Sequence, residues 1–140
     1  MEKIKNINIL IRNSQSSESS KKPIETELFT IGSLYKDKNK WIIRYENDSH
    51  GISEVIVCGE SSVILNSIGD IKYSFKLIEG RTKQSDFEAE GLFVCVNIRT
   101  TRVFHNIDVT GGTIDLEYAM ETATDVISNN KINIFFNSAG

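Results

Sequence analysis

The sequence predicts an all-β protein, a single closed, antiparallel meander barrel of about 8–10 strands with little or no helix. Apolar residues alternate with polar ones in most segments, which places successive side chains on opposite faces of a sheet. Turn-forming residues separate these short segments at close intervals. No segment carries the apolar i, i+3, i+4 stripe of a capped helix. With 140 residues, of which 39% are hydrophobic, the chain is expected to form one domain over residues 1–140.

The first half of the chain predicts five strands. Ile7, Ile9 and Ile11 alternate with polar neighbours and predict the first strand, and the polar segment 14–22 that follows predicts a flexible loop. Pro23 stands where the second strand is expected to begin, and Gly32 predicts a bulge or bend within that strand. The second to fifth strands are expected at 24–35, 41–46, 52–58 and 63–66.

The second half predicts further strands joined by hairpins. Gly69-Asp70 and Gly111-Gly112 are turn signals, and Met120 opens the best candidate for a helical turn, up to Asp125. The many short strands predict a sandwich or a barrel. Several of them are apolar on one face and mixed on the other, which fits a closed barrel without free sheet edges. The strands of this half are expected at 71–78, near 87, and at 92–100, 103–109, 113–120 and 131–137.

Charge and hydropathy exclude several classes of protein. The net charge is -3 and both signs are spread along the chain, which argues against a nucleic-acid-binding face. There is neither the continuous apolar stretch of a membrane-spanning helix nor an export signal, because the apolar residues at the start alternate with polar ones. Cys58 and Cys95 lie in apolar strand segments and are expected to be buried free thiols. We therefore expect a cytoplasmic protein that contacts neither membrane nor nucleic acid.

A set of dispersed residues gives the chain a family resemblance. From about Thr26 to the C-terminus it resembles the YwiB-like bacterial family, a domain of unknown function with a calycin-like, lipocalin-shaped barrel. The resemblance implies the fold and no activity. Ser67 stands where relatives tend to carry an arginine, which leaves any role of that arginine without a counterpart here. The residues that carry the resemblance are Gly32, Tyr35, Trp41, Tyr45-Glu46, Gly69, Phe75, Gly80, Phe87, Gly91, Ile98, Thr100, Gly111-Gly112, Ile114, Leu116 and Tyr118.

Six residues are candidates for ligand binding. Tyr45 and Glu46 are adjacent in a strand, so they point to opposite faces; a carboxylate inside an apolar barrel would have a raised pKa, whereas an outward Glu46 would form an ion pair. Arg99 and Arg102 form the densest cationic cluster and are expected to mark a strand end, where they could hold an anion at the barrel mouth or serve as surface charge. The complete candidate set is Arg44, Tyr45, Glu46, Arg99, Arg102 and Tyr118.

The sequence carries no metal or cofactor motif. His50, His105, Cys58 and Cys95 lack the short local spacing of zinc ligands, so neither a metal nor another cofactor is expected. Gly111-Gly112 lacks the residues that follow a phosphate-binding loop.

Three functions remain in order of preference. The first is a module that binds a small apolar, amphipathic or anionic molecule in the lumen or mouth of the barrel. The second is a solid scaffold that forms a homodimer through an outer face or edge, because Phe135 and Phe136 make one strand apolar on both sides. The third is an enzyme that uses Glu46, Glu117 or His105, which we favour least because no catalytic geometry can be derived from the sequence.

Overall fold

The computed structural model of the chain describes residues 2–17, 22–48 and 50–139. These residues form ten strands and, within the described ranges, no helix, so the predicted all-β class is confirmed. In these ranges there is consequently no helix long and apolar enough to cross a lipid bilayer. The strands are β1 (Glu2–Ser16), β2 (Ile24–Asp37), β3 (Lys40–Asn47), β4 (Gly51–Gly59), β5 (Ser62–Ile68), β6 (Ile71–Ile78), β7 (Thr82–Ala89), β8 (Leu92–Asp108), β9 (Gly111–Glu121) and β10 (Val126–Ser138).

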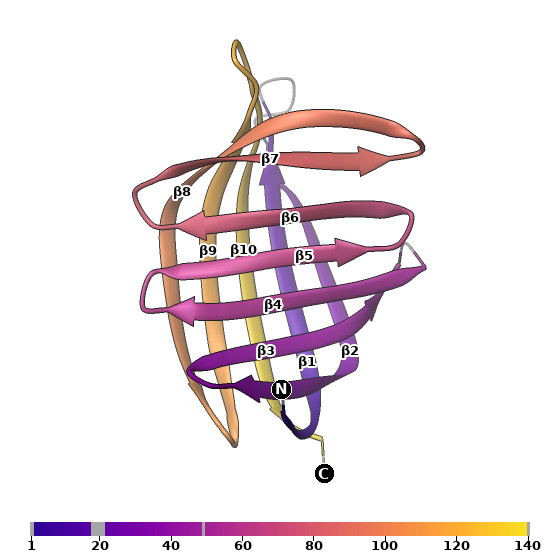
Figure 1. Cartoon of the computed structure of the whole chain (residues 1–140), viewed down its shortest axis with the longest axis vertical. Coiled ribbons are helices and arrows are strands. Elements are labelled where there is room, and N and C mark those ends of the chain that lie inside the picture. Colours follow the sequence, from indigo (N-terminus) through magenta and orange to yellow (C-terminus); the bar gives the residue numbers. More distant parts are fainter. Residues whose placement is uncertain (1, 18–21, 49, 140) are drawn as a thin grey trace.

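The ten strands close into one antiparallel meander barrel. Each strand pairs with its neighbours in sequence, and β1 closes the ring by pairing with both β2 and β10. Figure 1 shows two layers that cross at a steep angle: β3 to β7 lie across the front, while β1, β9 and β10 run vertically behind them. The predicted closed meander is therefore confirmed, and its calycin-like description fits.

Two long strands, β2 and β8, connect the layers at opposite corners (Figure 1). The last part of β2, from Ser33, pairs with β3 of the front layer, and almost all of β2 pairs with β1 of the rear layer. The corner of β2 lies at Gly32, where an added Cβ would collide with the carbonyl oxygen of Arg44. Pairing with β1 continues through Gly32 without a register shift, so this glycine permits a bend and a close approach and is not a bulge.

In β8 the corner is a bulge at Thr101, which corrects the predicted division into two strands, 92–100 and 103–109. The register with β9 shifts between Thr100 and Arg102, so Thr101 and Arg102 both lie on the outer face. The bulge exchanges the parity of the strand: even-numbered residues such as Ile98 point inward before it, and odd-numbered residues such as Val103 point inward after it. The sequence therefore shows two alternating segments out of phase, although they form one continuous strand.

Two turns also differ from their predictions. Ser14 and its two successors extend β1 and pair with β10, so part of the predicted loop 14–22 is strand; its residues 18–21 lie outside the described ranges. The β8–β9 turn lies at Val109 and Thr110, not at Gly111-Gly112. Asp108 Oδ1 accepts hydrogen bonds from the backbone N–H and hydroxyl of Thr110, and these bonds hold the pKa of Asp108 below its usual value.

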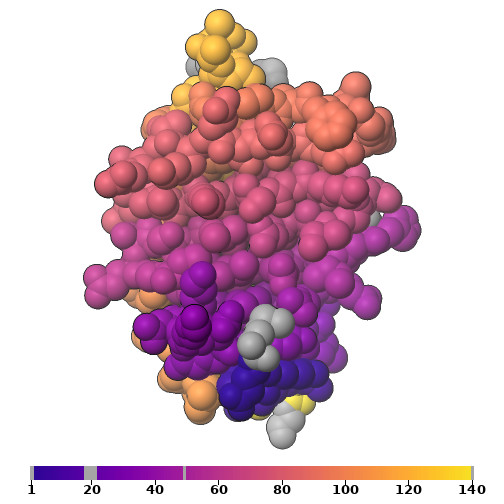
Figure 2. Space-filling model, viewed as in Figure 1, coloured from indigo at the N-terminus to yellow at the C-terminus, as the bar shows by residue number. Residues whose placement is uncertain are grey.

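The interior is filled with apolar side chains. Ile7, Leu34 and Ile98 have no solvent-accessible surface, which means that no water-sized probe fits beside them. Burial of each such side chain stabilises the fold by about 1.5–3 kcal/mol. Figure 2 shows that the strands of the front layer also pack side by side into a continuous surface. The core cluster consists of Ile7, Ile9, Leu34, Ile43, Val55, Val57, Val63, Leu65, Phe75, Leu77, Val96, Ile98, Val103, Ile114, Leu116, Tyr118, Ile134 and Phe136.

Candidate functional site

A groove lies on the outer face of the barrel, over β1 and between the side chains of β2 and β10. It has a volume of about 490 Å³ and mainly apolar walls. Its position follows from the alternation of β1: Ile9 and Ile11 point into the core, so Leu10 between them points outward. We call it the β1 groove and define it by its outward residues Asn8, Leu10, Phe29, Ile31, Phe135 and Asn137.

Cross-strand register brings the apolar residues of the groove together. Leu10 is directly opposite Phe29 on β2 and directly opposite Phe135 on β10, so the three form one row across three strands. Phe29 is 74% exposed, and Ile31, two residues further along β2, is 67% exposed. Side chains this large and this exposed in one place are typical of a binding surface.

The polar groups of the groove are mainly uncharged. Asn8 Nδ2 donates a hydrogen bond to Asn137 Oδ1 at 3.3 Å, which places two side-chain amides at one end. The cation Arg12, two residues from Leu10 on the same outer face of β1, forms an ion pair with Glu27 at 3.0 Å. The groove therefore offers an apolar body and an amide end without an uncompensated charge.

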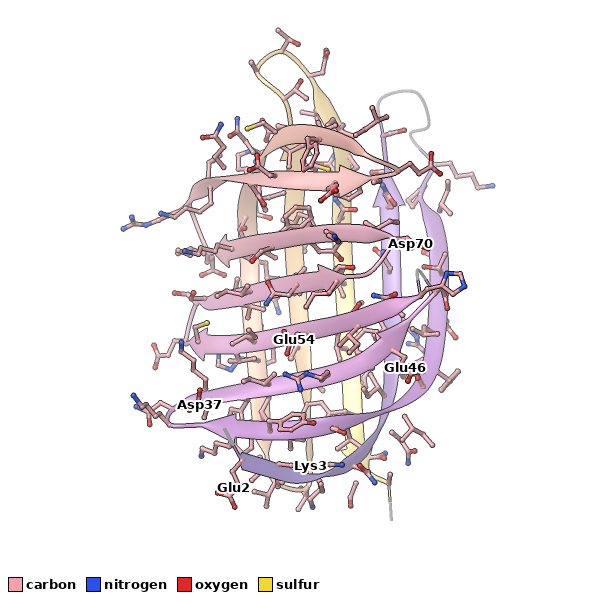
Figure 3. All side chains as sticks on the ribbon, turned by 45° about the vertical axis from the view of Figure 1, so that its right-hand side comes forward. Glu2, Lys3, Asp37, Glu46, Glu54 and Asp70 are labelled. Carbon is pink, nitrogen blue, oxygen red and sulfur yellow. The ribbon has the colours of Figure 1, made fainter. Side chains whose placement is uncertain are left out.

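The candidate residues of β3 lie on both sides of the barrel wall. Tyr45 points inward and is half-buried, whereas Arg44 and Glu46 point outward. Arg44 Nη2 donates to Glu54 Oε2 at 2.6 Å, and this bond raises the pKa of Arg44; its guanidinium also lies 4.8 Å from the centre of the Tyr35 ring. Glu46 is exposed on the outer face (labelled in Figure 3). It is therefore not a catalytic carboxylate inside the barrel.

Arg99 and Arg102 lie on the outer face in the middle of β8, not at a strand end or barrel mouth. Arg99 Nε forms an ion pair with Glu121 Oε1 at 2.5 Å. Arg102 lies 3.8 Å from Glu117, whose other oxygen is 3.6 Å from Lys131 Nζ. Arg99 thus forms an ion pair between β8 and β9, and Arg102 belongs to a separate network across β8, β9 and β10.

Tyr118 belongs to an aromatic cluster inside the barrel. The rings of Tyr73 and Phe75 are stacked with centroids 4.2 Å apart, and Phe75 meets Tyr118 edge-on at 6.5 Å. Burial raises the pKa of Tyr45, Tyr73 and Tyr118, because it disfavours the charged phenolate. Of the six predicted binding residues, Tyr45 and Tyr118 share the interior, and Arg99 and Tyr118 both line a second hollow of about 600 Å³, but no single site brings all six together.

The remaining candidates for chemistry are apart from one another. His50 is exposed in the β3–β4 turn, beside Asp70, whereas His105 Nε2 lies 2.6 Å from the carbonyl oxygen of Gly59. Both cysteines are free thiols on the outer face; Cys58 is half-buried and Cys95 is exposed, which corrects the prediction that both are buried. Within the described ranges, no group of three or more histidine, cysteine or carboxylate side chains could hold a metal ion.

Comparison with known proteins places this geometry in a family. Residues 9–134 match the model of a family described as a domain of unknown function, DUF1934. The chain belongs to this family. The barrel is also similar to the crystal structure of the YwiB protein from Bacillus subtilis, with a TM-score of 0.85 and 17% identity over 97% of this chain and 93% of that chain. Among the curated proteins, no match to the chain is found.

For this DUF1934 domain the likeness to YwiB establishes the fold alone, and the predicted YwiB-like resemblance is confirmed. The sequence-based selection of residues missed the β1 groove. Its signal was present, since Phe29 and Ile31 alternate with the inward residue Thr30. What the sequence lacked was the register that brings Phe29 beside Leu10 and Phe135.

Proposed function

We propose that this DUF1934 domain is a binding module that holds a small amphipathic molecule in the β1 groove. The observation that carries the proposal is the row Phe29–Leu10–Phe135, exposed on the wall of a groove of about 490 Å³. Ligand pockets in proteins commonly have volumes of about 300–1,000 Å³, apolar walls and a few polar groups.

The chemistry of the groove defines the ligand class. Its apolar walls favour a drug-sized apolar body, and the amide pair Asn8–Asn137 favours a polar group that is itself uncharged. An anionic group would find its closest cation on this face, Arg12, already neutralised by Glu27. An uncharged polar end is therefore favoured over a carboxylate or phosphate.

The location differs from the lumen or mouth of the barrel, where the sequence analysis expected the ligand. The core side chains with no accessible surface fill the middle of the barrel, so a ligand there would have to displace well-packed apolar groups. The outer groove requires no such rearrangement.

Native mass spectrometry and dye binding test the proposal. The protein purified from cells is expected to carry an adduct of small-molecule mass, and the neutral dye Nile red is expected to bind saturably at one site. Phe135→Glu is expected to weaken Nile red binding at least about tenfold, because it places a charge in the apolar wall.

Phe104→Glu provides the matched control. Phe104 is 44% exposed and Phe135 is 39% exposed, and both lie on outer faces, but Phe104 is outside the groove. Absence of saturable binding, or an equal loss of binding in the two variants, would contradict the proposal.

The second candidate function is the solid homodimeric scaffold. The packed interior favours this function. So do the exposed side chains of Phe29 and Ile31 on β2, whose residues 24–32 have an unpaired main-chain edge on the side away from β1 within the described ranges. That edge lies beyond β2, so its occupation does not exclude a ligand over β1.

A further inference from the structure

Strand β2 has a main-chain edge that the barrel does not use. Residues 24–36 pair with β1 on one side, while pairing with β3 on the other side begins only at Ser33. Within the described ranges, residues 24–32 pair with no strand on that second side. We call residues 24–32 the free β2 edge.

The corresponding corner at β8 is closed by hydrogen bonds from the hairpin turns. Thr100 N donates to the carbonyl of Arg81 at 3.0 Å, and Gly80 N donates to the carbonyl of Thr100 at 2.9 Å. Further along, Val103 N donates to Glu79 Oε1 at 3.0 Å. The unpaired side of β8 therefore has partners for its main chain at this corner.

The free β2 edge has no such partners among residues 22–48 and 50–139. Hairpin ends of the front layer, one of them marked by Asp70 in Figure 3, point at β2 from this side. In that part of the chain they form no main-chain hydrogen bond with residues 24–32. The two corners of the barrel thus differ: hydrogen bonds to the main chain of Thr100 and Val103 close the β8 corner, and no bond of this kind is found at residues 24–32 in the described part of the chain.

An unpaired strand edge is a template for another strand, and proteins usually protect it with lysine, proline or a bulge. Pro23 lies just before the free β2 edge, but no lysine occurs within 24–32 and pairing with β1 has no register shift there. The edge instead carries Phe29 and Ile31, both more than 60% exposed. The charged residues of the edge, Glu25 and Glu27, lie toward one end and Glu27 is paired with Arg12, so it is the part of the edge around Phe29 and Ile31 that favours strand addition.

We propose that the free β2 edge pairs with the same edge of a second copy of the chain, antiparallel about a two-fold axis at Phe29. A two-fold axis perpendicular to the sheet makes any strand antiparallel to its own copy, so one edge suffices for a closed dimer. The proposal is independent of the proposed ligand, which would lie over β1 on the other side of Phe29.

The outward side chains of the edge determine the register. With the axis at Phe29, the two phenylalanines face each other, and Glu27 faces Ile31 of the partner subunit. With the axis at Glu27, two carboxylates would stand directly opposite each other, which is destabilising. An aromatic pair at the axis and separated carboxylates favour the register at Phe29.

Light scattering and two variants with opposite charges at Phe29 test the dimer. Light scattering over a range of concentrations is expected to give the mass of two chains. Phe29→Lys and Phe29→Glu are each expected to raise the dissociation constant at least about tenfold, because like charges then meet at the axis. Mixing the two variants is expected to restore a heterodimer. Phe93, which is also 74% exposed but lies at the start of β8, supplies the control pair Phe93→Lys and Phe93→Glu.

Residue-resolved hydrogen exchange tests the pairing mode. As the concentration rises through the dissociation constant, alternate amides within residues 26–32 are expected to become protected, since they gain carbonyl partners. A monomer at all concentrations overturns the proposal. A dimer that survives both Phe29 variants, or one that leaves these amides unprotected, overturns it as well, while Nile red binding to the β1 groove is judged separately.

Discussion

At the scale of single residues, tight packing of the wall and burial in the interior decide what each position tolerates. Gly32 stands where β2 crosses from one layer to the other, and an added Cβ there would meet both the Arg44 carbonyl and Ile9 Cδ1. Gly59, the last residue of β4, has nothing within 4 Å of its added Cβ. Close packing therefore requires a glycine at position 32, whereas position 59 has room for a side chain.

We expect Gly32→Ala to lower the free energy of unfolding by about 2–3 kcal/mol, because the backbone carbonyl that it meets cannot rotate away. Gly59→Ala is the control and should change stability by less than about 0.5 kcal/mol. Urea unfolding followed by tryptophan fluorescence measures both. Equal stability of the two variants would show that β2 adapts at its corner.

The interior tyrosines predict alkaline instability. Burial raises the folded-state pKa of Tyr45, Tyr73 and Tyr118 above the ordinary value of 10.0. Below pH 10 the contribution of these tyrosines to the free energy of unfolding is fully present. As the pH rises past 10, tyrosines of the unfolded chain ionise first, so this contribution declines until the pH reaches the folded-state pKa. Urea unfolding between about pH 9 and 11 should show this decline, and Tyr118→Phe should make it less steep. An identical decline in that variant would argue against a raised pKa for Tyr118.

At the scale of elements, the bulge in β8 determines which residues form the core on that side. Thr101 is the extra residue, and beyond it the odd-numbered residues Val103, His105 and Ile107 turn inward. The sequence did show the change of phase between the two apolar segments, but a turn and a bulge both produce that change. The pairing pattern distinguishes a bulge from a turn: β9 pairs with residues on both sides of Thr101, so β8 continues as one strand, while β7 pairs with its first part only.

Deletion of Thr101 is expected to lower the free energy of unfolding by about 2–3 kcal/mol, because it removes the bulge that bends β8 at the corner. Val103 stays inward in this variant, since Arg102 then follows Thr100 in regular alternation. Thr101→Ala keeps the bulge and loses only the hydrogen bond from its hydroxyl to the Glu117 carbonyl, so it should cost about 1 kcal/mol or less. Circular dichroism during thermal unfolding measures both variants. A deletion variant that unfolds cooperatively near the parent temperature would contradict this role.

At the scale of the whole molecule, the barrel is a closed meander whose interior is filled and whose outer face carries the β1 groove. The aromatic cluster around Phe75 occupies the interior, where Phe75 is 2% exposed. The free β2 edge is a second feature of the outer wall: over residues 24–32, β2 pairs with β1 alone in the described part of the chain, while hairpin ends of the front layer point toward it.

Phe75→Ala is expected to lower the free energy of unfolding by about 3–5 kcal/mol and to open an apolar cavity. Benzene should then bind the variant but not the parent protein, since an empty apolar cavity accepts such ligands. Phe93→Ala, at an exposed position, should change stability by less than about 0.5 kcal/mol. Benzene binding by the parent protein would indicate a lumen that is not filled.

The sequence by itself determined the strand class and the inward residues such as Ile7, Ile9 and Ile98, because side-chain alternation is a local property of the backbone. Alternation alone left a sandwich or a barrel open, and the family resemblance indicated the calycin-like barrel. Only the tertiary structure decided which side chains lie next to one another on the outer face of the barrel. Leu10 gains Phe29 and Phe135 as neighbours only through register, and Arg99 lies in mid-strand only because β8 continues through its bulge. Register and strand ends depend on pairing between segments far apart in the chain, so the groove and the free β2 edge could not be derived from local pattern.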